Sequence, residues 1–87
     1  MDFECIETLN HMPRRSFKAL LSAVSSCPEY SRISVRGAAN ADEAQKRILA
    51  RVFNSHGITV GRPEDENFDL VLDAAVNAFN RRAAQHR

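Results

Sequence analysis

Residues 63–87 read PEDENFDLVLDAAVNAFNRRAAQHR and predict a helix with two apolar stripes, where a small soluble protein needs only one. Pro63 suits the first helical position, because its missing amide hydrogen would find no partner there anyway. The three acids after it complement the positive end of the helix dipole, and Arg81, Arg82 and Arg87 complement the negative end. This stretch therefore carries signals for both ends of a helix.

The first stripe of this helix recurs at helical spacing and predicts a face that packs on the core. Its members are Phe68, Val71, Leu72, Ala75, Val76, Phe79 and Ala83. A thinner stripe on roughly the opposite side consists of Leu70, Ala74 and Ala78, beside Asn77 and Arg81. Small residues allow a second helix to approach closely, and a leucine supplies an apolar anchor. The thinner stripe therefore predicts a second packing surface.

Two kinds of segment are candidates to cover the thinner stripe. One is another part of this chain, such as an N-terminal helix that presents Ile6 and Leu9. The other is a protein partner, either foreign or a second copy in a homodimer. In the second case, arginines next to the stripe select an acidic rim on the partner. The docking surface would then comprise Leu70, Ala74, Ala78, Arg81 and Arg82.

Two further helices are predicted near the N-terminus. Residues 2–11 carry acids in their first turn, which the helix dipole favours. From residue 14 to about residue 26, four apolar residues fall on one face at helical spacing: Phe17, Leu20, Leu21 and Val24. Cys27-Pro28 ends this helix, because a residue before proline is pushed away from helical dihedral angles.

The middle of the chain predicts two short strands around another helix. Residues 30–36 alternate between polar and apolar side chains, and residues 58–60 make a second brief strand. Between them, Asn40 and Glu43 resemble a capping box that starts a helix over residues 41–56. The glycine after this helix stands where a left-handed cap residue is favoured.

These elements predict one compact, mainly helical domain over residues 1–87, with about four helices and at most a minor two-stranded β ribbon. A chain of 87 residues has no room for a second folded domain. The expected core is a single cluster of Phe17, Leu20, Leu21, Val24, Ile48, Val52, Phe53, Phe68, Val71, Leu72, Val76 and Phe79.

Composition and charge narrow the class of protein. Apolar residues make up 44% and charged residues 26%, which favours a globular domain over a disordered chain. The formal net charge is +1, so a polyanionic partner would need a local basic surface. No apolar run approaches the roughly 20 residues that span a bilayer, and no signal segment precedes the fold. With two cysteines in so small a chain, the expected location is the reducing cytoplasm.

No motif for catalysis, a metal or a cofactor stands out. Cysteine and histidine are metal-ligand types, but their spacing here is unlike the paired ligands of zinc sites. Cys27 would be a poor nucleophile beside His56, because the carboxyl end of a helix raises a thiol pKa. The GITVG run at 57–61 lacks the Lys-Ser/Thr end of a phosphate-binding loop, and acids follow it. We therefore expect no enzyme, metal or cofactor, and interpret Cys5 and Cys27 as buried apolar residues.

Basic residues support DNA binding as an alternative. Residues 47–63 resemble the recognition helix and first wing strand of winged-helix repressors, although no second wing strand and no preceding helix at helix-turn-helix spacing are predicted. The resemblance implies that three side chains face the major groove, namely Lys46, Arg47 and Arg51. Arg32 and Arg36 share one face of the predicted strand over residues 30–36 and add local positive charge.

The expected function is a small, non-enzymatic interaction module that occupies a surface on another protein, as a regulator or inhibitor does. It would dock through the C-terminal helix, so Leu70→Arg should abolish association without unfolding the domain. The DNA alternative predicts instead that Arg47→Ala and Arg51→Ala weaken binding and flatten its salt dependence.

Overall fold

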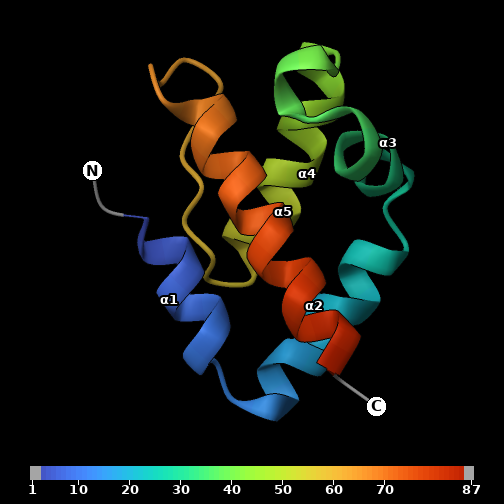
Figure 1. Ribbon diagram of the computed structural model, residues 1–87, viewed down its shortest axis with the longest axis vertical. Helices are drawn as coiled ribbons and strands as arrows, with labels where there is room; N and C mark the ends of the chain where they lie inside the picture. The colour runs from blue at the N-terminus through green and yellow to red at the C-terminus, as the bar shows by residue number, and fades with distance from the viewer. Residues whose placement is uncertain (1–2, 86–87) are drawn as a thin grey trace.

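Helix α5 (Phe68–Gln85) lies across the front of the molecule in Figure 1, with α1 (Glu4–His11) along one side and α3 (Pro28–Arg36) on the other. Helix α2 (Arg14–Ser25) lies at the base, and α4 (Glu43–Ser55) lies behind α5. The structure is a computed structural model that describes residues 3–85. Over these residues the chain forms a compact globule of five α-helices and one short 3₁₀ turn, η1 (Ala38–Asn40), without a strand. The prediction of a compact, mainly helical domain is confirmed.

The helices α1 and α2 form where the sequence predicts them, α1 from the acids in its first turn and α2 from its apolar spacing. Helix α2 buries Phe17, Leu20 and Val24 along one face. Helix α1 begins at Glu4, and Asp2 of the predicted helix lies outside the described residues, as do the last two residues of the predicted C-terminal helix. The dihedral restriction that Pro28 imposes on the residue before it separates α2 from the next element, as expected.

Both predicted strands are wrong. Residues 30–36 belong to α3, in which Pro28 occupies the first turn and Ile33 is the buried anchor. Over so few residues, alternation at positions 33 and 35 does not distinguish a strand from a helix, and Val35 is exposed. Residues 58–60 form an extended loop. The amide of Val60 donates to the Asn54 side chain at 3.0 Å, so a local bond takes the place of a strand partner.

The starts of two helices also differ from prediction. The capping box of α4 is formed by Asp42 and Gln45, whereas the Asn40 side chain donates to the Arg36 carbonyl. Helix α5 starts at Phe68, five residues after the predicted start at Pro63. A tight turn intervenes, because the Asp65 carboxylate accepts from the Arg62 amide at 2.9 Å. After α4, Gly57 has φ 84°, which confirms the predicted left-handed cap residue.

The core centres on the ring of Phe79. It packs against Phe17 of α2, Tyr30 of α3 and Phe53 of α4, with ring centroids 5.5, 5.4 and 6.0 Å away. The expected core is confirmed for most members, and Leu21, Val52 and Val71 pack on its margin. Ile48 is an error, since it is 46% exposed on α4. The buried residues that the expected core lacks include Cys5, Leu9, Ile33, Ala38, Leu49, Ala50, Ile58, Val60, Ala75 and Ala78.

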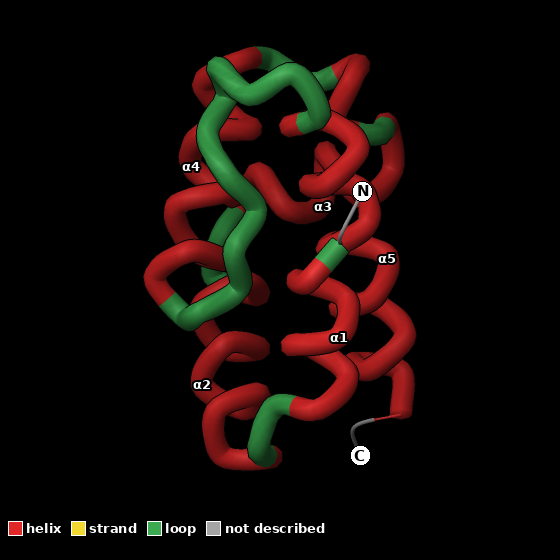
Figure 2. The backbone as a smooth tube through the Cα atoms, turned by 90° about the vertical axis from the view of Figure 1, so that its left-hand side faces the viewer, coloured by secondary structure: helices red, strands yellow, loops and turns green. Residues whose placement is uncertain are grey.

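The loop over residues 56–67 joins α4 to α5 and positions the surfaces described next. Figure 2 shows it running along the molecule between α4 and the pair α1 and α5. Ile58 and Val60 fasten it to the core, because both side chains are buried. The loop therefore forms a fixed wall beside α4 on one side and beside α1 on the other.

Candidate docking surface and basic groove

The outer face of α5 carries an apolar stripe that the fold leaves partly open. Leu70 is 58% exposed, Ala74 is half-buried, and Asn77 and Arg81 are exposed. These four residues follow one another at helical spacing, so they lie in a row along α5. Leu70, Ala74 and Arg81, three of the predicted docking residues, therefore reach the surface together.

Helix α1 covers the remainder of this stripe. It packs along α5, with Leu9 fully buried and Ile6 half-buried in the contact region. Ala78 is fully buried as a result, and it is not available to a partner. The prediction for Ala78 as a docking residue is therefore corrected: the self-coverage alternative applies at this position and not at Leu70.

Arg82 belongs to the fold and not to a docking rim. Its Nη1 donates to the Leu9 carbonyl at 2.6 Å, which satisfies a carbonyl in the last turn of α1. Its guanidinium carbon lies 4.5 Å from the centroid of the Phe17 ring, a cation–π arrangement. One side chain thus ties α5 to both α1 and α2, and the expectation that Arg82 selects an acidic rim is corrected.

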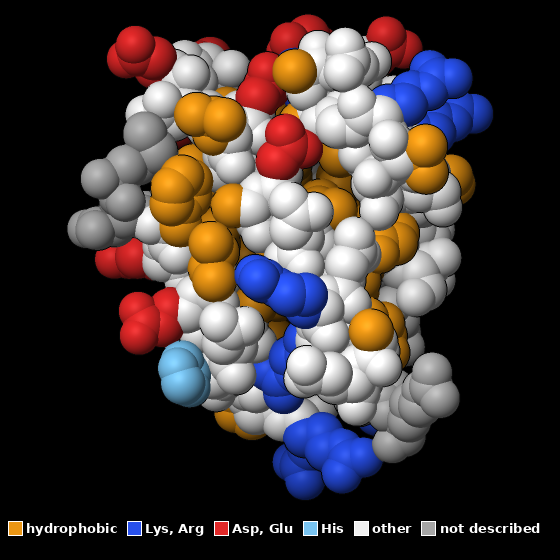
Figure 3. Space-filling model, viewed as in Figure 1, with side chains coloured by type: hydrophobic (Ala, Val, Ile, Leu, Met, Phe, Trp, Pro, Cys, Tyr) orange, Lys and Arg blue, Asp and Glu red, His pale blue; other side chains and the backbone are white. Residues whose placement is uncertain are grey.

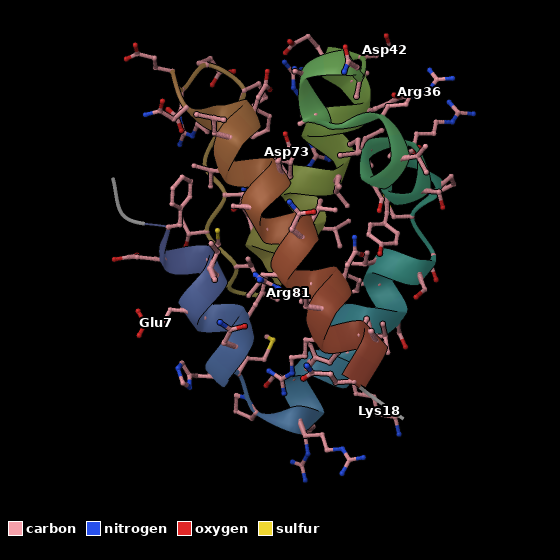
Figure 4. All side chains as sticks on the ribbon, in the orientation of Figure 1. Glu7, Lys18, Arg36, Asp42, Asp73 and Arg81 are labelled. Carbon is pink, nitrogen blue, oxygen red and sulfur yellow. The ribbon has the colours of Figure 1, made fainter. Side chains whose placement is uncertain are left out.

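A shallow hollow opens between α1 and the exposed stripe of α5. It is lined by Ile6, Ala74, Asn77, Asn80 and Arg81. Figure 3 shows hydrophobic side chains gathered where α1 and α5 lie side by side, with basic atoms next to them. In Figure 4, Arg81 lies between the two helices, whereas Glu7 points away on the far side of α1. The hollow thus combines two apolar side chains, Ile6 and Ala74, with two amides and one cationic edge.

Lys46 is not exposed enough to contact a DNA duplex. Its side chain is 7% exposed, and its Nζ lies 2.9 Å from Asp69 and 3.2 Å from Glu43. The hydrogen bond that Lys46 donates to the Asp69 carboxylate raises the pKa of Lys46 above its ordinary value. Lys46 therefore links α4 to α5, and its predicted contact with the major groove is corrected.

The other basic residues are exposed, on two different helices. Arg47 and Arg51 lie one turn apart on α4, while Arg32 and Arg36 lie on α3. Figure 4 shows Arg36 pointing outward. A basic residue outside the predicted set, Arg62, joins Arg47 and Arg51 along one groove. Sequence spacing alone gave no signal for it, because the loop and α4 meet only in the folded chain.

The winged-helix resemblance fails at the first wing strand, because residues 58–60 form a loop. The prediction that no helix directly precedes the helix over residues 41–56 is also wrong, because α3 precedes α4. DNA binding itself stays a prediction, now resting on exposed arginines without Lys46.

Both cysteines are buried, as predicted, and neither is paired. Cys27 directly follows Ser26, the C-cap of α2, as expected, but it is also the N-cap of α3, whose dipole acts on the thiol in the opposite direction. Burial nevertheless raises the pKa of Cys27, and Glu29, whose carboxylate accepts from the thiol at 3.5 Å, raises it further. Burial also raises the pKa of Cys5.

Alkylation should reveal these raised pKa values. The folded protein holds each thiol proton more tightly than the unfolded chain, so this contribution to stability is full below about pH 8.5 and is lost as the pH rises through the folded value. At pH 8.5, we expect iodoacetamide to label Cys5 and Cys27 at least about tenfold more slowly in the native protein than in urea. Mass spectrometry follows the labelling. Equal labelling rates in the native protein and in urea would contradict burial of the two thiols.

Within residues 3–85, no group of three or more His, Cys, Asp and Glu side chains gathers as metal ligands would. His86 lies outside the described residues. In the same part of the chain, no helix combines the length and the apolar character needed to cross a membrane. Comparison with protein-family models, with curated proteins and with solved structures found no match to the chain.

Proposed function

We propose that this domain is a non-enzymatic docking module that binds a partner protein through the outer face of α5 and the adjoining edge of α1. The observation that carries the proposal is the exposed Leu70 in line with the hollow beside Ala74. An exposed leucine next to a concave apolar surface with a polar edge has the composition of an interface centre and rim. The partner would insert an apolar anchor into the hollow.

Charge favours a foreign partner over a second copy of this chain. In a symmetric dimer, the exposed stripe of α5 would face itself. That stripe presents Arg81 without an acid, and the nearby Asp73 is already engaged as acceptor for the Ala38 amide at 2.8 Å. A foreign segment that carries a carboxylate next to its apolar anchor complements Arg81 better. We therefore propose an acidic, amphipathic segment as the occupant.

Leu70→Arg tests the proposal. Because Leu70 is exposed, its replacement should leave the unfolding midpoint close to that of the parent protein while weakening association by about 30-fold or more, the effect of losing a hot spot. A photo-crosslinking residue at position 77 would trap the partner in cell extract, and mass spectrometry would quantify the adduct with and without Leu70→Arg.

Val35→Arg is the matched control. Val35 is 86% exposed on α3, so the substitution adds the same charge at an exposed position on a different helix. It should leave the adduct unchanged. Equal loss of the adduct in both variants, or unfolding of the Leu70→Arg protein, would contradict the docking surface. Sedimentation equilibrium of the pure protein measures self-association. A dimer that dissociates in the Leu70→Arg variant would show that the partner is a second copy of this chain.

A further inference from the structure

A second surface lies on the opposite side of the 56–67 loop from α1. It is a groove of about 480 Å³ between α4 and the loop. Arg47 and Arg51 stand one helical turn apart on the α4 wall, and Arg62 stands on the loop wall. The remaining lining residues are Ala50, Asn54, Ser55, Gly61 and Pro63. Three guanidinium groups therefore share one groove with neutral surroundings.

The loop wall of this groove is fixed to α4 by one side chain. The Asn54 Oδ1 accepts from the Val60 amide at 3.0 Å, and its Nδ2 donates to the Gly61 carbonyl at 3.2 Å. The Asp65 carboxylate holds the next turn by accepting from the Arg62 amide. The backbone that carries Arg62 is thus set in place before any ligand arrives, which lowers the entropy lost on binding.

The three guanidinium groups have no carboxylate partner within the described part of the chain. The ion pairs found there both involve Lys46. Of the acids near the loop, Glu4, Asp65 and Glu66 line a separate pocket on its α1 side, whereas Glu64 follows the groove residue Pro63 and lines neither the pocket nor the groove. The loop therefore divides a basic groove from an acidic pocket, and like charges in the groove stay uncompensated.

We propose that this groove binds a phosphomonoester dianion. Guanidinium forks match the oxygens of a phosphate group, and a dianion with three terminal oxygens uses three arginines more fully than a single carboxylate does. No aromatic side chain lines the groove to stack a base, and the acidic pocket beyond the loop repels a long polyanion. These features favour a compact phosphate group over a nucleic acid strand. The site is separate from the α1 and α5 surface and does not depend on the proposed function.

The test is an NMR titration of the ¹⁵N-labelled full chain at pH 7.5 and constant ionic strength. The probes are inorganic phosphate, a phosphoserine pentapeptide and its unphosphorylated form. We expect saturable shifts for the amides of Arg51, Ser55 and Arg62 with both phosphate probes and none with the unphosphorylated peptide.

Arg62→Gln and Arg47→Gln should each weaken binding about tenfold, because each removes a charge-assisted contact. At pH 5 the phosphoserine is a monoanion and should bind several-fold more weakly.

Arg36→Gln is the matched control, because Arg36 is an exposed arginine on α3 and is absent from the groove lining. It should bind as the parent protein does, and so should Leu70→Arg. Tighter binding of the phosphopeptide than of inorganic phosphate identifies a phosphorylated protein as the source, and equal binding identifies a small phosphate compound. Shifts that do not saturate, the same loss with Arg36→Gln, or tighter and steeply salt-dependent binding of a DNA duplex would overturn the proposal.

Discussion

Replacing Phe79 by alanine is expected to lower the free energy of unfolding by about 3–5 kcal/mol, the usual effect of truncating a buried aromatic residue. The Phe79 ring contacts aromatic rings from three other helices, so the truncation removes packing partners from Phe17, Tyr30 and Phe53 at once. Small domains have total stabilities near 5–10 kcal/mol, so the variant should lose a large part of its stability and unfold at a clearly lower urea concentration. Urea denaturation followed by far-UV circular dichroism measures the change.

Leu70→Ala provides the control for this experiment. Leu70 lies on the same helix but is mostly exposed, so its truncation should change the free energy of unfolding by less than about 0.5 kcal/mol. Phe79→Leu, which keeps most of the buried volume, should fall between the two. If Phe79→Ala were as mild as Leu70→Ala, the four aromatic side chains would not form the centre of the core.

Lys46→Glu is expected to have the second largest effect on stability, a loss of about 3 kcal/mol. The substitution places a carboxylate in the nearly buried position between Asp69 and Glu43, where the native ammonium group joins α4 to α5. Asp69 is 42% exposed and Glu43 is 70% exposed, so water screens part of this repulsion. Thermal and urea unfolding at pH 7 measure the loss.

Lys46→Met separates charge from burial at the same position. Methionine keeps the length and apolar stem of lysine, so the loss should stay within about 1 kcal/mol. Because Lys46 is paired inside the fold, the same variant should leave any duplex binding unchanged. Stability of Lys46→Glu equal to that of Lys46→Met would show that the ion pairs do not form in solution.

Helix α2 and most of the core were predictable because their apolar residues repeat at helical spacing, and α1 and α4 were predictable because residues that favour a helix start lie near their first turns. The strand over residues 30–36 was predicted wrongly because a nine-residue helix with a single buried residue, Ile33, has too few apolar positions to show its period. The start of α5 was misplaced because proline and acids suit a helix N-terminus and a turn equally well. Which of the two forms depends on the hydrogen bond from Arg62 to Asp65.

The candidate surfaces were predictable only in part. Exposed arginines on α4 and an apolar stripe on α5 follow from helix periodicity, and Leu70, Ala74, Arg81, Arg47 and Arg51 do reach the surface. The structural roles of Lys46 and Arg82 did not follow from helix periodicity, because these two side chains bind groups 23 and 73 residues away along the chain. Only packing of the helices brings such partners together.

The sequence by itself therefore determined the helical class of this protein and the apolar faces of its longer helices, since these depend on spacing within a few residues. The tertiary structure alone decided which surfaces remain open. Helix α1 buries Ala78 and leaves Leu70 exposed, and the 56–67 loop brings Arg62 to the arginines of α4. The physical reason is that exposure and charge pairing depend on neighbours distant in sequence, which local periodicity does not specify.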